Sequence, residues 1–143
     1  MKKIQVVVIG VDFKDNPEEA WKNLKHLEFL RELEIHFVHI SSSDNIEAPV
    51  YPSGEMKLVI EHSILLKLNQ LASELLPKNC NHPIVAKCLF DTNPKKAFSD
   101  YAEKVGAQLV ILSRGKKNHL SIRSFIQYQV RHSRSNVLVL KSI

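Results

Sequence analysis

The stretch Leu109–Leu140, LVILSRGKKNHLSIRSFIQYQVRHSRSNVLVL, decides the fold of this chain. Apolar runs stand at its two ends, QLVIL at 108–112 and NVLVL at 136–140, and such runs are typical of strands buried on both faces. Between them, after a short basic loop, apolar residues recur at helical spacing: Ile122, Phe125, Ile126 and Val130. The stretch therefore predicts a strand, a crossover helix and a second strand parallel to the first.

The same alternation of strand and helix extends back to the start of the chain. Apolar runs predict three further strands, at Ile4–Val11, Glu34–Ile40 and Pro83–Phe90. A long helix is predicted from near Ser53 to Leu76, where Pro77 would end it. Its apolar stripe should consist of Met56, Ile60, Ile64, Leu68, Leu71 and Leu75.

Two more helices are predicted at Asn-Pro pairs, because Asn can cap a helix and Pro fits its first position. The first pair is Asn16-Pro17, and Ala20, Leu24, Leu27 and Arg31 follow it at helical spacing, with Trp21 beside them. The second pair is Asn93-Pro94, with Ala97, Tyr101 and Val105 as the expected buried face. Gly106 suits the position after that helix, where a left-handed conformation is common.

Five strands alternating with helices predict an α/β fold, an open parallel sheet with helices on both faces. We expect one domain over residues 1–143, a common domain size. The composition, 44% hydrophobic and 24% charged, is typical of a soluble protein, and no apolar run approaches the ~20 residues that span a membrane. The positions expected to be buried include Val6, Val8, Phe37, Val85, Val110 and Leu138.

The start of the chain and its cysteines indicate a cytoplasmic location. MKKIQVVVIGVD resembles a signal peptide at first, but the apolar run stops at Asp12 without a small-residue cleavage site, which favours a strand. Cys80 and Cys88 are then expected to be reduced, with Cys88 packed as a small core residue.

Positive charge is concentrated near the carboxyl terminus. Residues 114–143 carry seven of the basic residues and no acid, so the rest of the chain has a net charge of −2 against +5 overall. This asymmetry indicates a local anionic partner, although a solvated basic face explains it equally well. Histidine, cysteine and acidic spacings show no metal site: His36 and His39, for example, stand at an odd offset on one strand.

The chain resembles the universal stress proteins, a family with a Rossmann-like fold. The segments that carry the resemblance are Asp12 at a strand end, AEKVGAQLVILSRG at 102–115 and VRHSRSNVLVL at 130–140. The resemblance implies a five-stranded parallel sheet in the order 3-2-1-4-5, and commonly a homodimer. It also implies a nucleotide site at the carboxyl ends of the strands, where open α/β sheets bind ligands.

Nucleotide-binding members of that family carry Gly-x-x-Gly, nine residues, and then Gly-Ser or Gly-Thr. Gly115 matches the second glycine and Ser124 the final hydroxyl residue. Leu112 and Arg123 stand where the first and third glycines belong, and the loop is two residues shorter. These departures count against the family's ATP mode, because glycines let backbone amides approach phosphate oxygens. Basic side chains, Arg123 among them, could hold a phosphate by charge instead.

The sequence therefore predicts a degenerate site for a nucleotide or another phosphate ligand, at which ATP is a possible but disfavoured ligand. It consists of Asp12, Ile40, Arg114, Gly115, Lys116, Arg123, Ser124 and Phe125. The carboxyl-terminal strand is predicted to lie at the sheet edge and to pair with a second copy through Val137, Leu138, Val139 and Leu140.

Three functions follow for the chain. The favoured one is a non-enzymatic stress-response or regulatory domain that works as a homodimer and requires no cofactor. The second is an ATP-binding or slowly ATP-hydrolysing member; it needs a general base and a magnesium-binding carboxylate, for which Asp12 and Asp91 are the candidates. The third and least favoured is nucleic-acid binding through the basic carboxyl-terminal third, which has no accompanying reading motif.

Overall fold

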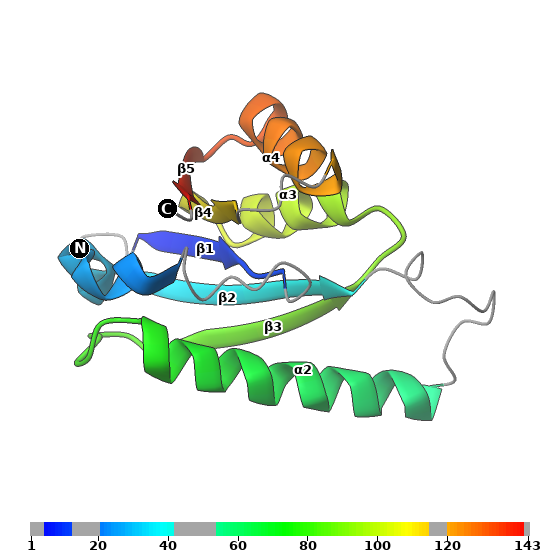
Figure 1. Cartoon of the computed structure of the whole chain (residues 1–143), viewed down its shortest axis with the longest axis horizontal. Helices are drawn as coiled ribbons and strands as arrows, with labels where there is room; N and C mark the ends of the chain where they lie inside the picture. The colour runs from blue at the N-terminus through cyan, green and yellow to red at the C-terminus, as the bar shows by residue number, and fades with distance from the viewer. Residues whose placement is uncertain (1–4, 13–20, 42–53, 115–119, 142–143) are drawn as a thin grey trace.

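The computed structural model contains a five-stranded parallel sheet in the order β3-β2-β1-β4-β5, as the sequence predicted (Figure 1). The structure describes residues 5–12, 21–41, 54–114 and 120–141, and the Asn16-Pro17 pair lies outside them. The strands are β1 (Val6–Gly10), β2 (Glu34–Ser41), β3 (Val85–Phe90), β4 (Ala107–Arg114) and β5 (Asn136–Lys141).

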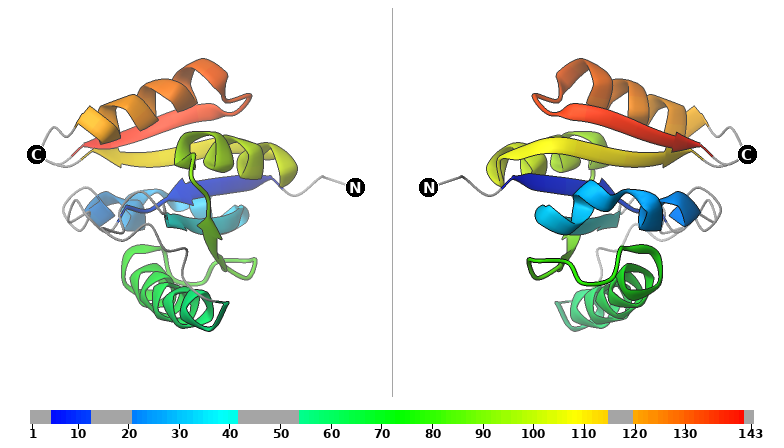
Figure 2. Two further views of the ribbon diagram at one scale, coloured as in Figure 1. Left: turned by 90° about the vertical axis from the view of Figure 1, so that its right-hand side faces the viewer. Right: turned by 90° about the vertical axis from the view of Figure 1, so that its left-hand side faces the viewer.

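Helices cover both faces of the sheet (Figure 2). One face carries the long helix α2 (Gly54–Leu75) with two short 3₁₀ helices, η1 (Lys22–His26) and η2 (Glu28–Glu32). The other face carries α3 (Pro94–Lys104) and α4 (Leu120–His132). Each face has its own buried apolar cluster, so the central strand β1 contributes Val7 and Ile9 to one cluster and Val6 and Val8 to the other. The predicted three-layer α/β fold is confirmed.

Between Lys22 and Glu32 the chain does not form the α-helix that the sequence predicted through Arg31. This segment forms η1 and η2, which are separated at Leu27, whose φ of −86° and ψ of 80° are not helical. The reason is visible in the apolar residues, which recur every third position: Trp21, Leu24, Leu27, Leu30 and Leu33. A 3₁₀ helix has three residues per turn, so this spacing puts all of them on one side. Trp21, Leu24 and Leu30 are fully buried there.

The inward faces of the long helices differ in part from the predicted stripes. Met56, at the start of α2, is 60% exposed, whereas Leu68 and Leu75 are buried. With 22 residues α2 is about 33 Å long, against about 20 Å for the six-residue strand β3 beneath it. The first turns of α2 therefore extend past the sheet, as Figure 1 shows.

On the opposite face, the buried residues of α3 are Phe98 and Ala102, while the predicted Ala97, Tyr101 and Val105 are half-buried beside them. Val130 of α4 is 61% exposed, and Gln129 is fully buried in its place. The ends of α3 follow the prediction. The Asn93 side chain accepts a hydrogen bond from the Lys96 amide, and Gly106 has a φ of +70°.

The core is centred on β1, β2 and β4. Val6, Val8, Phe37 and Val110 are buried as predicted. Val85 and Leu138 are only half-buried, so those two predictions are wrong. Both residues lie on outer strands, β3 and β5, where packing partners exist on fewer sides.

Candidate functional site

The carboxyl ends of β1 and β4 meet at the point where the strand order reverses. β1 and β4 are neighbours in the middle of the sheet. The chain that leaves β1 crosses to β2 on one side of this pair, whereas the chain that leaves β4 crosses to β5 on the opposite side. In open α/β sheets this reversal leaves a crevice at the carboxyl edge for a ligand. The candidate residues at this edge come from the end of β1, the end of β4 and the first turns of α3 and α4.

The end of β1 is tied to β2 by two hydrogen bonds. The Val11 amide donates to the Val38 carbonyl over 2.8 Å, and His39 Nδ1 donates to the Val11 carbonyl over 2.8 Å. These bonds fix the backbone directly before Asp12, which is partly exposed at the edge. The structural role of His39 is thus to hold the strand end that carries Asp12.

Strand β4 continues two residues beyond the predicted end at Leu112. Ser113 and Arg114 still pair with β5, opposite Leu140 and Lys141. The apolar pattern marked the buried part of the strand, while the pairing with β5 extends the backbone ladder into the polar residues. The backbone amides of Ser113 and Arg114 thus belong to strand rather than to a loop, which favours side chains as the ligand-binding groups at this end.

Leu112, which stands at a family glycine position, points into the core and is 3% exposed. Its Cδ2 lies close to Gly10: a Cβ added to that glycine would be 3.1 Å from Cδ2 and 2.9 Å from Phe98 Cε2. The Phe98 ring in turn meets the Phe125 ring edge to face, with centroids 5.4 Å apart. Gly10, Leu112 and the two phenylalanines therefore form a tight layer directly beneath the edge, and this layer holds α3 and α4 against the sheet.

Lys95 and Ser124 join the first turn of α3 to α4. The Lys95 ammonium donates a hydrogen bond to Ser124 Oγ. One turn further along α4, the buried Gln129 donates from Nε2 to the Lys95 carbonyl over 2.9 Å. Sequence reasoning missed Lys95, because nothing in the sequence shows that the start of α3 lies beside α4. The one available signal was an amide, Gln129, on the apolar face of the last helix.

The other predicted site residues are placed as follows. Ile40 is half-buried at the carboxyl end of β2 and packs on the α3–α4 side. Arg123 is exposed on α4 and Arg114 is partly buried at the end of β4. Gly115 and Lys116 lie outside the described residues. The structure thus brings Asp12, Arg114, Ser124 and Phe125 to one edge, with Ile40 two strands away from β4.

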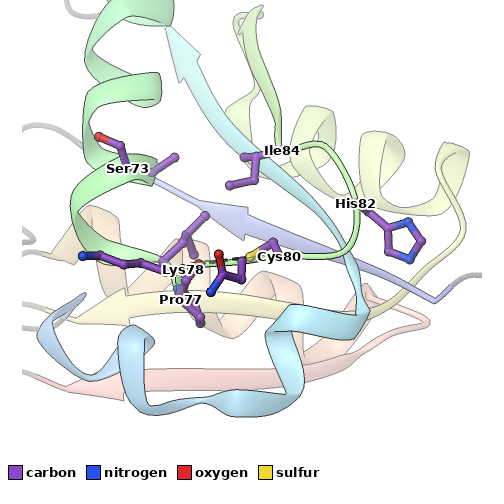
Figure 3. A pocket seen from close by; sticks show the side chains of 9 residues that line it. Ser73, Pro77, Lys78, Cys80, His82 and Ile84 are labelled. Carbon is purple, nitrogen blue, oxygen red and sulfur yellow. Dashed lines mark hydrogen bonds between the residues drawn. The ribbon is translucent and has the colours of Figure 1, made fainter.

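Away from this edge, a hollow of about 510 Å³ lies between the end of α2 and the start of β3 (Figure 3). Its polar side chains include Ser73, Lys78, Cys80 and His82. Burial raises the pKa of the Cys80 thiol, and the thiol donates to the Pro77 carbonyl over 3.2 Å. His82 points away from Cys80 in Figure 3. A protonated thiol without a neighbouring base is a poor nucleophile, so this hollow shows no reactive site.

Both cysteines are free, as predicted, and Cys88 is buried in the sheet. Within the described ranges, no three histidine, cysteine, aspartate or glutamate side chains gather closely enough to hold a metal ion. Among the helices of that same part of the chain, none has the length and apolar character to cross a membrane.

The strand order and the helices on both faces define an open, doubly wound α/β domain. Comparison with known families assigns this domain to one family. The model of the Universal stress protein family matches residues 3–141. The chain therefore belongs to the universal stress protein family, as its strand-end and carboxyl-terminal segments indicated. A comparison with curated proteins found no match.

Solved structures share this fold over nearly their whole length. One is a hypothetical protein, PH0823, with a TM-score of 0.76, 21% identity and coverage of 97% of this chain and 96% of that one. A universal stress protein in complex with cAMP has a TM-score of 0.65, 17% identity and coverage of 99% and 100%. The universal stress protein from Archaeoglobus fulgidus in complex with dAMP has a TM-score of 0.62, 14% identity and the same coverage.

Proposed function

We propose that this chain is a non-enzymatic regulatory domain of the universal stress protein type, which binds a nucleotide or other phosphate compound at the carboxyl edge of its sheet. The observation that carries the proposal is the reversal of strand order between β1 and β4. Asp12, Arg114, Arg123 and Ser124 are the residues that we propose for the ligand at this edge. Two structures with the same fold hold cAMP and dAMP, which supports an adenine nucleotide as the ligand.

Weak binding of ATP is expected, since this chain offers side chains where nucleotide-binding members offer glycines. Calorimetric titration of the full chain with ATP and AMP tests this, beside native mass spectrometry of freshly purified protein for any retained nucleotide. Replacing Arg123→Gly should weaken binding if the guanidinium contacts phosphate, and strengthen it if the side chain obstructs the site. No binding of either compound to the wild type would overturn the proposed function.

The absence of turnover is part of the proposal. Of the two acids considered as catalytic groups, Asp91 uses Oδ1 to accept a hydrogen bond from the Asn93 amide over 2.8 Å, in the turn that leads into α3. Asp12 would then have to act alone, whereas phosphoryl transfer uses a group that positions the nucleophile and a carboxylate that holds magnesium. Incubation with labelled ATP and magnesium should show no hydrolysis above the buffer rate, and hydrolysis that Asp12→Asn abolishes would favour the ATPase alternative.

Homodimerisation through β5 is the second part of the proposal. The strand forms one edge of the sheet, and its residues Val137 to Leu140 are all half-exposed in the single chain. On one face, Leu138 and Leu140 pack only partly buried against the core cluster, whereas the main contacts of α2 with the sheet are with β2 and β3. An apolar edge of this kind is open to pairing with another strand, and antiparallel pairing with its own copy closes as a two-fold dimer.

A further inference from the structure

We propose that the Lys95 side chain binds the phosphate of the ligand, so that the start of α3 contributes a positive charge to the site. This inference rests on the proposed function, and it deepens it by naming the residue and the chemical group it recognises. It begins from an unusual feature of Lys95: this partly buried ammonium has a hydroxyl, Ser124 Oγ, as its partner.

The neighbouring cations on α3 and after α4 are paired differently. Lys96 Nζ lies 3.9 Å from Asp100 Oδ2, and Arg134 Nη1 lies 3.4 Å from Glu103 Oε1. Within the described part of the chain, Lys95 has no such carboxylate partner. Because its partner is a neutral hydroxyl, the positive charge of Lys95 is not offset by a carboxylate, and an anion at this position would be attracted to it.

The donors at this point converge. A lysine ammonium has three N–H donors, and the contact with Ser124 uses one of them. Because Ser124 Oγ accepts from Lys95, its own hydroxyl hydrogen is available to a further acceptor. The ionised oxygens of a phosphate group have no hydrogen and can only accept, so a phosphate group can accept hydrogen bonds from both side chains.

Position and rigidity support the same assignment. Lys95 lies in the first turn of α3 and Ser124 near the start of α4, and both helices begin at the carboxyl edge, where their strands end. The fully buried Gln129 holds the Lys95 carbonyl, and the Phe98–Phe125 contact holds the two helices together beneath it. The ammonium is thus carried on fixed backbone, which favours a binding role. Gln129 acts as a positioning residue.

The test compares Lys95→Met with Lys96→Met, which removes the same charge from the next residue. Calorimetry on the full chain would use AMP, inorganic pyrophosphate and adenosine, which separate the phosphate from the nucleoside. We expect Lys95→Met to weaken AMP and pyrophosphate binding about 10-fold or more, as for the loss of one hydrogen bond to a charged group, with adenosine binding unchanged. Lys96→Met should bind all three like the wild type.

Two results would overturn the inference while leaving the proposed function intact. One is unchanged AMP affinity in Lys95→Met. The other is an equal loss of AMP and adenosine binding, because this would mean that Lys95 only stabilises the packing of α3 against α4 through Ser124. A lower urea midpoint of the Lys95→Met variant would support this purely structural role. If the wild type binds none of the three compounds, the proposed function fails and the inference fails with it.

Discussion

Replacing Gly10→Ala should destabilise the protein, because the end of β1 has no room for a methyl group. The added Cβ would lie 2.9 Å from Phe98 Cε2 and 3.1 Å from Leu112 Cδ2. Carbon atoms in favourable contact are about 3.5–4.0 Å apart. Phe98 would therefore have to move by at least roughly half an ångström, and Leu112 by a few tenths of an ångström. Phe98 is 1% exposed and Leu112 is 3% exposed, so neither can move without disturbing the core.

Two effects of opposite sign decide the magnitude. Overpacking of a filled core costs about 1–3 kcal/mol. Alanine is better than glycine within a strand by about 0.5–1 kcal/mol, since it loses less backbone entropy on folding. Because the new Cβ meets two buried side chains at once, the overpacking cost should lie in the upper part of its range, about 2–3 kcal/mol. We therefore expect a net loss of about 1–2.5 kcal/mol in the free energy of unfolding.

Urea unfolding followed by fluorescence of Trp21 measures this loss, because that indole is fully buried and is the one tryptophan of the chain. A double-mutant cycle with Leu112→Val provides the control. Valine at position 112 lacks the Cδ2 atom that lies nearest to the new methyl group on that side. The double variant should therefore lose less free energy of unfolding than the two single variants lose together. Gly10→Ala that is as stable as the wild type, or a strictly additive cycle, would refute the packing argument.

Three further predictions concern the edge strand and two buried groups. Val139→Lys should convert a β5 dimer into monomers, because it places a positive charge from each copy at the paired strands. Val59→Lys, on the exposed part of α2, should leave the dimer intact. A wild type that sediments as a monomer at micromolar concentration rules the dimer out. Burial raises the pKa of the Cys88 thiol from 9.0 to about 11, so the thiol ionises at lower pH in the unfolded chain and the free energy of unfolding should fall as the pH rises through this interval. In urea unfolding, the stability of Cys88→Ala should fall less steeply with pH than that of the wild type, and an identical pH dependence would contradict the shift. Tyr101→Phe removes the hydroxyl that lies 2.7 Å from the buried His36 Nδ1 and should cost about 1 kcal/mol in the same assay; an unchanged midpoint would show that this bond adds nothing.

The layered fold was predictable because strand and helix periodicity survive in the local sequence. Uninterrupted apolar runs such as Val6–Gly10 predict strands buried on both faces, and five of them separated by helices leave a parallel sheet as the consistent solution. The strand order and the family came from the resemblance of residues 102–115 and 130–140 to universal stress proteins, and the observed topology and the family match agree with both. Patterns of this kind depend only on residues that are close to one another in the sequence.

The interior of the candidate site depended instead on contacts between residues far apart in the sequence. Lys95 meets Ser124 because α3 and α4 pack on the same face, a relation that no local pattern contains. The same holds for Leu112, which reads as a departure from a glycine loop but fills the space beside Gly10 in the fold. The sequence by itself determined which segments are strands, in what order they alternate with helices, and that the strands are apolar enough to be buried between two helical layers. Only the tertiary structure decided which side chains meet at that edge, because packing brings together groups that the chain itself separates.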